Sequence, residues 1–167
     1  MWRGDFSAVL LRTVRPSELH LIDPWQFETG NEYGGPKGRA WYAGSRAKSQ
    51  EDMDAICDGV RRRFAEQIDA GVVRLHRASS ADVAARMPPG SLDWAYIDGN
   101  HLYEYVRADL DGFARVVRPG GLLAGDDFAV SGWYQDGVQR AVIAFLGAGG
   151  GELLYVNHSQ FLIRLPD

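Results

Sequence analysis

The stretch 92–128, which reads LDWAYIDGNHLYEYVRADLDGFARVVRPGGLLAGDDF, constrains the fold more than any other part of the chain. Leu92–Ile97 is a short apolar run without a helical period, which predicts a buried strand. Residues 101–117 carry apolar side chains at helical spacing, the run 118–121 (Arg-Pro-Gly-Gly) ends that helix, and residues 122–124 predict a second strand. Strand, helix and strand in this order form a βαβ unit, so we expect an α/β fold with a parallel sheet.

Acidic side chains follow both of these strands. Asp98 comes directly after the first strand, and Asp126 and Asp127 follow the second. The carboxyl ends of parallel strands share the edge where open α/β sheets bind ligands. Three carboxylates there would repel one another unless a cation lies among them or one stays protonated, and oxygen ligands of this kind suit Mg²⁺ or Ca²⁺. The alternative is that Asp98 and Asp126 cap helices and Asp127 is solvated.

The first half of the chain predicts a second set of elements with a long loop between them. Residues 6–13 have a helical pattern, and Leu19–Ile22 predicts a strand that ends at Asp23. An acid at such a strand tip can accept hydrogen bonds from both hydroxyls of a ribose, although a turn former before proline is the alternative. Residues 24–49 are rich in glycine and aromatic residues and show neither period, so we expect a lid or substrate loop, or else a packed surface excursion.

The remaining elements continue the alternation of helices and strands. We expect an amphipathic helix over residues 50–70 that ends at Gly71, and then a strand over residues 72–75. Ser79 and Ser80 precede a short helix, residues 82–86, where a serine could cap the helix or contact the edge of an adenine. A helix over Gly137–Gly147 is followed by two apolar runs, 153–156 and 161–165, whose connection is typical of a hairpin with an exposed His158.

Length and composition limit the class of protein. The 167 residues suit a single domain, residues 1–167, with a formal net charge of −4 that argues against a broad basic surface for nucleic acid. The basic run 61–63 is interpreted as a solvated helix face. A single cysteine, Cys57, excludes an intramolecular disulfide and a cysteine-rich zinc site, and its position predicts a place in the core. No apolar run approaches the ~20 residues of a membrane span and no signal-peptide profile is found, so we expect a cytoplasmic protein without membrane contact.

Three segments in this order, LHLIDPW, YIDGNHLYEYVRADL and VVRPGGLLAGDDF, resemble the class I S-adenosylmethionine-dependent methyltransferases. More narrowly, they are similar to a small bacterial branch with the motifs IDGxHxYE and PGGxxxxDD, although Asn100 stands where that family often has aspartate. The resemblance implies a Rossmann-like, mostly parallel sheet with helices on both faces and a C-terminal antiparallel hairpin. It also places the first residues inside the family's first glycine-rich motif, so the family's first, central strand is expected to be missing and two strand edges to be left unpaired.

The resemblance also implies roles for individual residues. Those that would contact S-adenosylmethionine are Trp2, Gly4, Ser7, Asp23, Trp25, Ser79, Ser80 and Asp98. Metal-dependent O-methyltransferases of this fold hold Mg²⁺ at the positions of Asp98, Asp126 and Asp127. His101, close to Asp98, is the candidate general base, because its ordinary pKa of about 6.5 suits neutral pH; capping the following helix is its alternative role.

The implied activity is the O-methylation of a small-molecule or sugar hydroxyl, with Mg²⁺ as an aid, and a homodimer is compatible with the sequence. A different reading is a non-catalytic Rossmann-like module that binds a cofactor or a partner and lacks the first strand. A nicotinamide-dependent dehydrogenase is less favoured, because the sequence offers no complete GxGxxG after a first strand.

Overall fold

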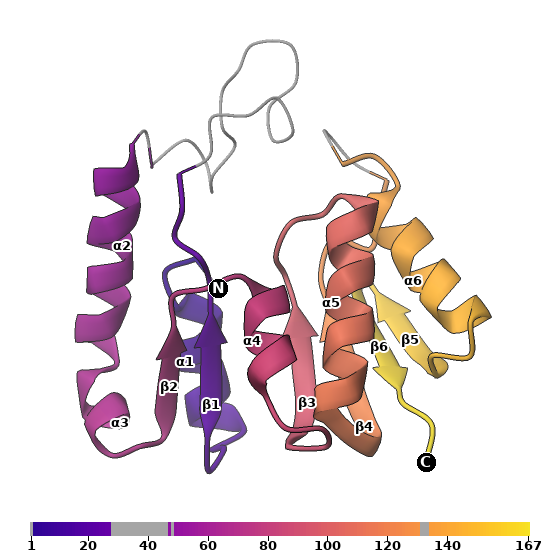
Figure 1. Cartoon of the computed structure of the whole chain (residues 1–167), viewed down its shortest axis with the longest axis horizontal. Coiled ribbons are helices and arrows are strands. Elements are labelled where there is room, and N and C mark those ends of the chain that lie inside the picture. The colour runs from indigo at the N-terminus through magenta and orange to yellow at the C-terminus, as the bar shows by residue number, and fades with distance from the viewer. Residues whose placement is uncertain (1, 28–46, 48, 131–133) are drawn as a thin grey trace. The chain divides into compact units, whose positions relative to one another are not determined.

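The computed structural model describes residues 2–27, 47, 49–130 and 134–167. They group into two compact units, Met1–Ser79 and Ser80–Asp167, and each unit is described by itself (Figure 1). Within the described ranges, no helix has both the length and the apolar character needed to cross a membrane.

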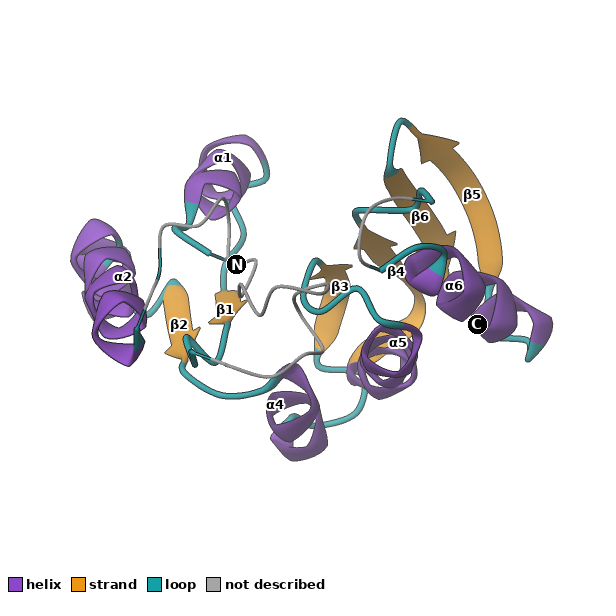
Figure 2. Cartoon of the chain, turned by 90° about the horizontal axis from the view of Figure 1, so that it is seen from above, coloured by secondary structure: helices purple, strands orange, loops and turns teal. Residues whose placement is uncertain are grey.

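The first unit contains a pair of parallel strands with helices beside it (Figure 2). In this pair Leu19 lies opposite Val73, and Ile22 lies opposite His76. The strand predicted at Leu19–Ile22 is confirmed, whereas the second strand lies one residue later than the predicted 72–75. The elements of the unit are α1 (Asp5–Thr13), β1 (Leu19–Ile22), α2 (Gln50–Arg63), α3 (Ala65–Asp69) and β2 (Val73–His76).

The long helix predicted over residues 50–70 is broken at Phe64. The helix α2 begins after Ser49, whose side chain accepts a hydrogen bond from the Asp52 N–H, and it buries Met53, Cys57 and Val60 at helical spacing. At Phe64 the backbone leaves helical geometry (φ −109°, ψ 19°), and α3 follows. The side chain of Phe64 is buried, so packing of this ring outweighs the helical pattern of the local sequence.

Two apolar side chains of the first helix are exposed. Phe6 and Val9 on α1 are 45% and 40% exposed, and the buried residue of α1 is Ser7.

The second unit is a four-stranded mixed sheet in the order β3-β4-β6-β5. Strands β3 and β4 are parallel, and β6 is antiparallel to both β4 and β5, so the predicted βαβ unit and the C-terminal hairpin are confirmed. Helix α5 packs on β3 and β4 and lies between α4 and α6 (Figure 2). The elements are α4 (Ser80–Arg86), β3 (Leu92–Ile97), α5 (Tyr103–Val116), β4 (Val117–Gly125), α6 (Gly137–Gly147), β5 (Glu152–Asn157) and β6 (Gln160–Arg164).

The strand β4 is longer than the strand predicted at residues 122–124. It begins directly after α5 and includes the Pro-Gly-Gly run. Its pairing with β3 shifts register between Leu92, which lies opposite Val117, and Trp94, which lies opposite Leu122. Gly121 lies so close to the neighbouring backbone that a Cβ there would come within 2.7 Å of the Asp93 carbonyl oxygen. The Pro-Gly-Gly run therefore lies within β4 at an irregularity in its pairing with β3, where Gly120 has a positive φ of 65°.

The strands β1 and β3 are edge strands of their sheets. Among the described residues, β1 pairs with β2 alone and β3 pairs with β4 alone. The mixed α/β architecture expected from the sequence is thus confirmed, with its strands in two sheets.

Candidate functional site

Three side chains that follow β3 and β4 converge in the second unit. The Nε2 atom of His101 lies 3.3 Å from Oδ2 of Asp127 and 3.7 Å from Oδ1 of Asp98. One donor atom from each residue lies within 4.8 Å of the others, and we call these three residues the acidic-histidine cluster. The side chain of Asp98 is half-exposed, and those of Asp127 and His101 are partly buried. The prediction that acids of both strand ends meet at one edge is therefore confirmed for Asp98 and Asp127.

Neighbouring elements hold this cluster in place. The hydroxyl of Tyr134 donates a 3.0 Å hydrogen bond to Oδ1 of Asp127, and its ring meets that of His101 edge-on at a centroid distance of 4.9 Å. Gly137 lies against the backbone of His101 so closely that any side chain at that position would collide with the carbonyl. No sequence pattern distinguishes Tyr134, because only the folded chain brings the start of α6 next to the β3–α5 connection.

Asp126 is directed elsewhere, although it adjoins Asp127 in the sequence. Its Oδ1 accepts hydrogen bonds from the Ser159 hydroxyl at 2.6 Å and from the Asp127 N–H at 2.8 Å. Burial alone would raise the pKa of Asp126, but these hydrogen bonds outweigh burial and hold the pKa below its usual range. Of the three predicted metal ligands, the structure brings Asp98 and Asp127 together with His101 and ties Asp126 to the hairpin.

The donor set of the cluster fits a divalent cation. Two carboxylates supply the oxygen ligands that Mg²⁺ prefers, and an imidazole nitrogen beside them also suits Mn²⁺ and related ions. The hydroxyl of Tyr96 accepts a hydrogen bond from Gln160, and burial together with the charges of Asp126 and Asp98 raises the pKa of this phenol. The carboxylates of Asp98 and Asp126 bring negative charge to this strand edge, where a cation would be favoured.

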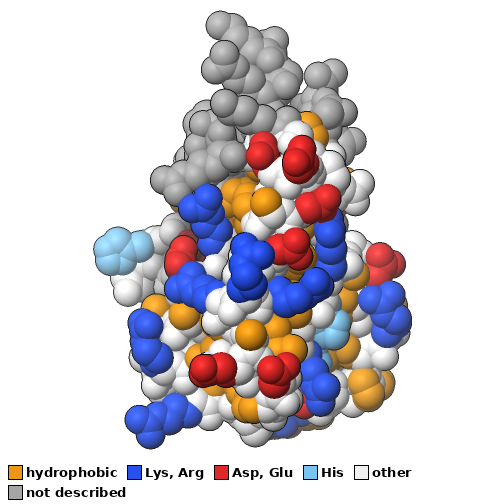
Figure 3. Space-filling view, turned by 90° about the vertical axis from the view of Figure 1, so that its left-hand side faces the viewer, with side chains coloured by type: hydrophobic (Ala, Val, Ile, Leu, Met, Phe, Trp, Pro, Cys, Tyr) orange, Lys and Arg blue, Asp and Glu red, His pale blue; other side chains and the backbone are white. Residues whose placement is uncertain are grey.

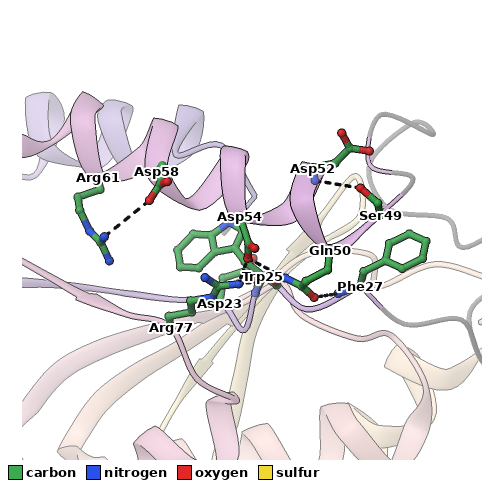
Figure 4. Close-up of polar contacts among 10 residues, drawn as sticks. All are labelled: Asp23, Trp25, Phe27, Ser49, Gln50, Asp52, Asp54, Asp58, Arg61 and Arg77. Atoms are coloured by element: carbon green, nitrogen blue, oxygen red, sulfur yellow. Dashed lines mark hydrogen bonds and ion pairs between the residues drawn. The ribbon is translucent and has the colours of Figure 1, made fainter.

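In the first unit, the predicted ribose-binding Asp23 is part of a tight turn. Its Oδ1 accepts a 2.8 Å hydrogen bond from the Trp25 N–H, as Figure 4 shows. Trp25 has a positive φ of 41°, a conformation that costs a residue with a side chain about 1–2 kcal/mol. The Trp25 indole is fully buried, and its Nε1 donates a 3.1 Å hydrogen bond to the Trp2 carbonyl oxygen. The cofactor contacts predicted for Trp2, Asp23 and Trp25 remain predictions.

Two of the predicted cofactor residues near the N-terminus, Gly4 and Ser7, are buried. Gly4 has a φ of 80°, and a Cβ there would lie 2.5 Å from Cε2 of Phe64, so glycine is required for both conformation and space. Ser7 on α1 is 6% exposed. Their roles toward a cofactor remain predictions, and a packing role is established for Gly4.

The two serines predicted near an adenine differ in their surroundings. Ser79 is exposed and precedes α4, whereas Ser80 is the first residue of that helix. The Ser80 hydroxyl donates a 2.5 Å hydrogen bond to Oδ1 of Asp109 on α5, and burial raises the pKa of Asp109 to about 6. Asp109 was not among the predicted site residues, although its position on the apolar side of α5, next to Leu110, is a sequence signal of a buried acid.

The surface formed by α2 carries mixed charges. Figure 3 faces this side of the molecule and shows basic side chains with acidic ones among them. Arg61, Arg62 and Arg63 are exposed, and Arg61 pairs with Asp58 one helical turn earlier. The basic run is therefore a solvated helix face, as predicted.

Solved structures with a similar fold include several methyltransferases. The O-methyltransferase NovP is 19% identical, with a TM-score of 0.57, and the match covers 100% of this chain and 69% of that chain. A putative methyltransferase from Streptococcus mutans, solved in complex with SAH, is 14% identical with a TM-score of 0.58, over 99% of this chain and 83% of that chain. A Corynebacterium glutamicum protein is 13% identical with a TM-score of 0.59, over 90% of this chain and 61% of that chain, so the present chain spans less than two thirds of its length.

These identities, all below 25%, establish a shared fold. A comparison with curated proteins finds no match. The comparison with protein families does find one, and it includes both Asp23 and the acidic-histidine cluster. Because residues 1–128 match the family described as a methyltransferase domain, the chain belongs to this family of methyltransferase domains.

Proposed function

We propose that the chain catalyses the transfer of a methyl group from S-adenosylmethionine to a hydroxyl of a small molecule or sugar. The observation that carries this proposal is the convergence of Asp98, His101 and Asp127 at the carboxyl ends of β3 and β4. A group that can remove a proton, set between two carboxylates at the ligand-binding edge of an α/β sheet, suits the activation of a hydroxyl. The names of two similar folds, an O-methyltransferase and a structure with bound SAH, support the same reaction class.

In this reaction S-adenosylmethionine would supply the methyl group, whose bond to sulfur breaks as a bond to the acceptor oxygen forms. Nε2 of His101 would take the hydroxyl proton, and the carboxylates of Asp127 and Asp98 would stabilise the resulting imidazolium. Tyr134 would keep Asp127 and the His101 ring in this arrangement. Asp23 on the first unit would accept hydrogen bonds from the ribose hydroxyls.

A divalent cation would fit the same cluster. Asp98 and Asp127 would hold Mg²⁺, and Asp126, the third ligand expected from the resemblance, would have to leave its hydrogen bond with Ser159 to join them. The ion would supply Lewis acidity that lowers the pKa of the acceptor hydroxyl. If Nε2 of His101 coordinated the metal, His101 could not act as the base, because the same lone pair would bind the metal and accept the proton.

Binding and turnover together test this proposal. We expect calorimetric titration to show binding of S-adenosylhomocysteine, and a panel of phenols and sugars to reveal a hydroxyl that is methylated. His101→Gln should lower turnover by about 100-fold or more, as expected for the loss of a general base. His158→Gln is the matched control, because that histidine is exposed at the hairpin turn. Equal activity of the two variants would show that His101 is not the base.

The metal is tested separately. If Mg²⁺ assists, EDTA should lower turnover of the wild type and added Mg²⁺ should restore it, while Asp127→Asn should weaken the response to Mg²⁺. Turnover that is indifferent to EDTA in the wild type, with Asp127→Asn fully active, would exclude the metal. No binding of S-adenosylhomocysteine by the wild type would instead favour a non-catalytic module.

A further inference from the structure

The turn that carries Asp23 also contains Trp25, and a network of three residues from other elements contacts Trp25. Gln50 and Asp54 lie one turn apart on α2, and Arg77 follows β2 directly. We call Gln50, Asp54 and Arg77 the turn clamp. Figure 4 shows Gln50 and Asp54 on α2 close to Trp25 and Arg77, and the contacts with Trp25 itself come from Gln50 and Arg77.

The contacts of the turn clamp meet at one carbonyl group. The Trp25 carbonyl oxygen accepts a 2.9 Å hydrogen bond from Nε2 of Gln50 and a 3.3 Å hydrogen bond from the Arg77 guanidinium. Asp54 joins the two donors, because its Oδ1 accepts from Nε2 of Gln50 at 2.8 Å and from the same guanidinium. The clamp is therefore a closed network and not a set of separate surface contacts.

The conformation of Trp25 also orients Asp23. The Trp25 N–H donates to Oδ1 of Asp23, so the direction of this carboxylate depends on the conformation of Trp25. The positive φ of Trp25 is unfavourable for a residue with a side chain, and it persists where surrounding contacts enforce it. The buried indole fixes the side chain, and the turn clamp fixes the carbonyl.

Gln50 extends the clamp by one further contact. Its Oε1 accepts a 2.9 Å hydrogen bond from the Phe27 N–H, so one side-chain amide contacts the backbone of both Trp25 and Phe27. The hydrogen bond from Arg77 and then that from Gln50 lower the pKa of Asp54, as expected for a carboxylate that accepts both.

We propose that Gln50, Asp54 and Arg77 are positioning residues that hold Asp23 in the conformation that binds the two ribose hydroxyls of the cofactor. This inference rests on the proposed function. Without the clamp, the Trp25 peptide units could rotate out of their strained conformation, and the hydrogen bond that aims Asp23 would be lost. The clamp would thus act on the ribose hydroxyls through Asp23 and leave other parts of the ligand unaffected.

A pair of ligands isolates this effect from general damage to the fold. The probes are S-adenosylhomocysteine and its 2′,3′-dideoxy analogue, which lacks the hydroxyls that Asp23 would bind. We expect Gln50→Ala to weaken the binding of S-adenosylhomocysteine by about fivefold, which is the size of one lost hydrogen bond, and to leave the affinity for the dideoxy analogue unchanged. Asp54→Asn, which keeps the shape of the side chain, should give a smaller change in the same direction.

Asp58→Asn is the matched control. Asp58 lies one turn further along α2, is exposed, and pairs with Arg61 at 3.6 Å. This variant should bind both ligands as the wild type does. Suppose that the wild type binds S-adenosylhomocysteine. The role of the clamp is then overturned if Gln50→Ala lowers the affinity for both ligands equally, or if it changes the affinity for neither. If the wild type binds neither ligand, the proposed function fails, and the role of the clamp fails with it.

Discussion

The hydroxyl of Ser80 donates a 2.5 Å hydrogen bond to the carboxylate of Asp109, and this contact joins the first residue of α4 to the buried side of α5. Asp109 is 8% exposed. Its other oxygen, Oδ2, lies beneath Gly99, where a Cβ would be 3.4 Å away. One buried carboxyl group therefore connects α4, α5 and the turn that follows Asp98.

Asp109→Asn should make the stability of the second unit less dependent on pH. Burial raises the pKa of Asp109 from 3.8 to about 6, so the folded state favours the neutral form. The contribution of Asp109 to the free energy of unfolding is complete below pH 3.8 and is lost as the pH rises through about 6. The free energy of unfolding changes by about 3 kcal/mol between these limits. We expect Asp109→Asn to be more stable than the wild type at pH 7.5, with the advantage shrinking toward pH 4, in urea unfolding.

Asp111→Asn provides the comparison for this experiment. Asp111 lies on the same helix, is half-exposed, and pairs with Arg107. Its replacement should leave the pH profile of unfolding close to that of the wild type. Parallel profiles for Asp109→Asn and the wild type would show that Asp109 is not protonated preferentially in the folded state.

Tyr134→Phe should lower methyl transfer without abolishing it. The change removes the hydrogen bond to Asp127 but keeps the ring that meets His101 edge-on. We expect turnover to fall by about threefold to tenfold, because one hydrogen bond that orients a carboxylate is lost. Steady-state kinetics measures the effect, and Tyr103→Phe on α5 serves as the control. Wild-type kinetics in Tyr134→Phe would mean that Asp127 needs no support from the phenol.

Ser159→Ala should raise the pKa of Asp126. Burial already acts in that direction, and the hydrogen bond from the Ser159 hydroxyl is the largest influence that opposes it. Carboxyl ¹³C chemical shifts followed against pH would report the change directly. His158→Gln at the same hairpin turn should leave the titration of Asp126 as it is. An unchanged pKa in Ser159→Ala would show that the backbone N–H of Asp127 is sufficient.

Gly4→Ala should destabilise the first unit by at least about 2 kcal/mol, because it combines a strained φ with a collision against Phe64. Gly71→Ala separates these two causes. Gly71 also has a positive φ, of 75°, but no atom lies within 4 Å of its would-be Cβ, so we expect the smaller loss of about 1 kcal/mol. Adding Phe64→Leu to Gly4→Ala should recover part of the stability in urea unfolding. Equal losses at the two glycines would rule out the collision.

Local patterns in the sequence account for much of the architecture. The bounds of β1, β3 and α6 agree with their predictions, because alternation, helical spacing and flanking glycines are properties of adjacent residues. The acids at the ends of β3 and β4 could also be placed at one sheet edge, since parallel strands bring their carboxyl ends together. Where the pattern misled, as at Phe64 and in β4, a contact with a distant residue or strand outweighed it.

The sequence by itself determined the family and the strand ends at which acids gather. The tertiary structure alone decided which side chains meet there. Asp126 and Asp127 are neighbours in the chain, yet one accepts a hydrogen bond from Ser159 and the other faces His101. No local period encodes such a choice, because the partners lie on segments far apart in the sequence. Their geometry exists only after burial of the core has brought those segments together.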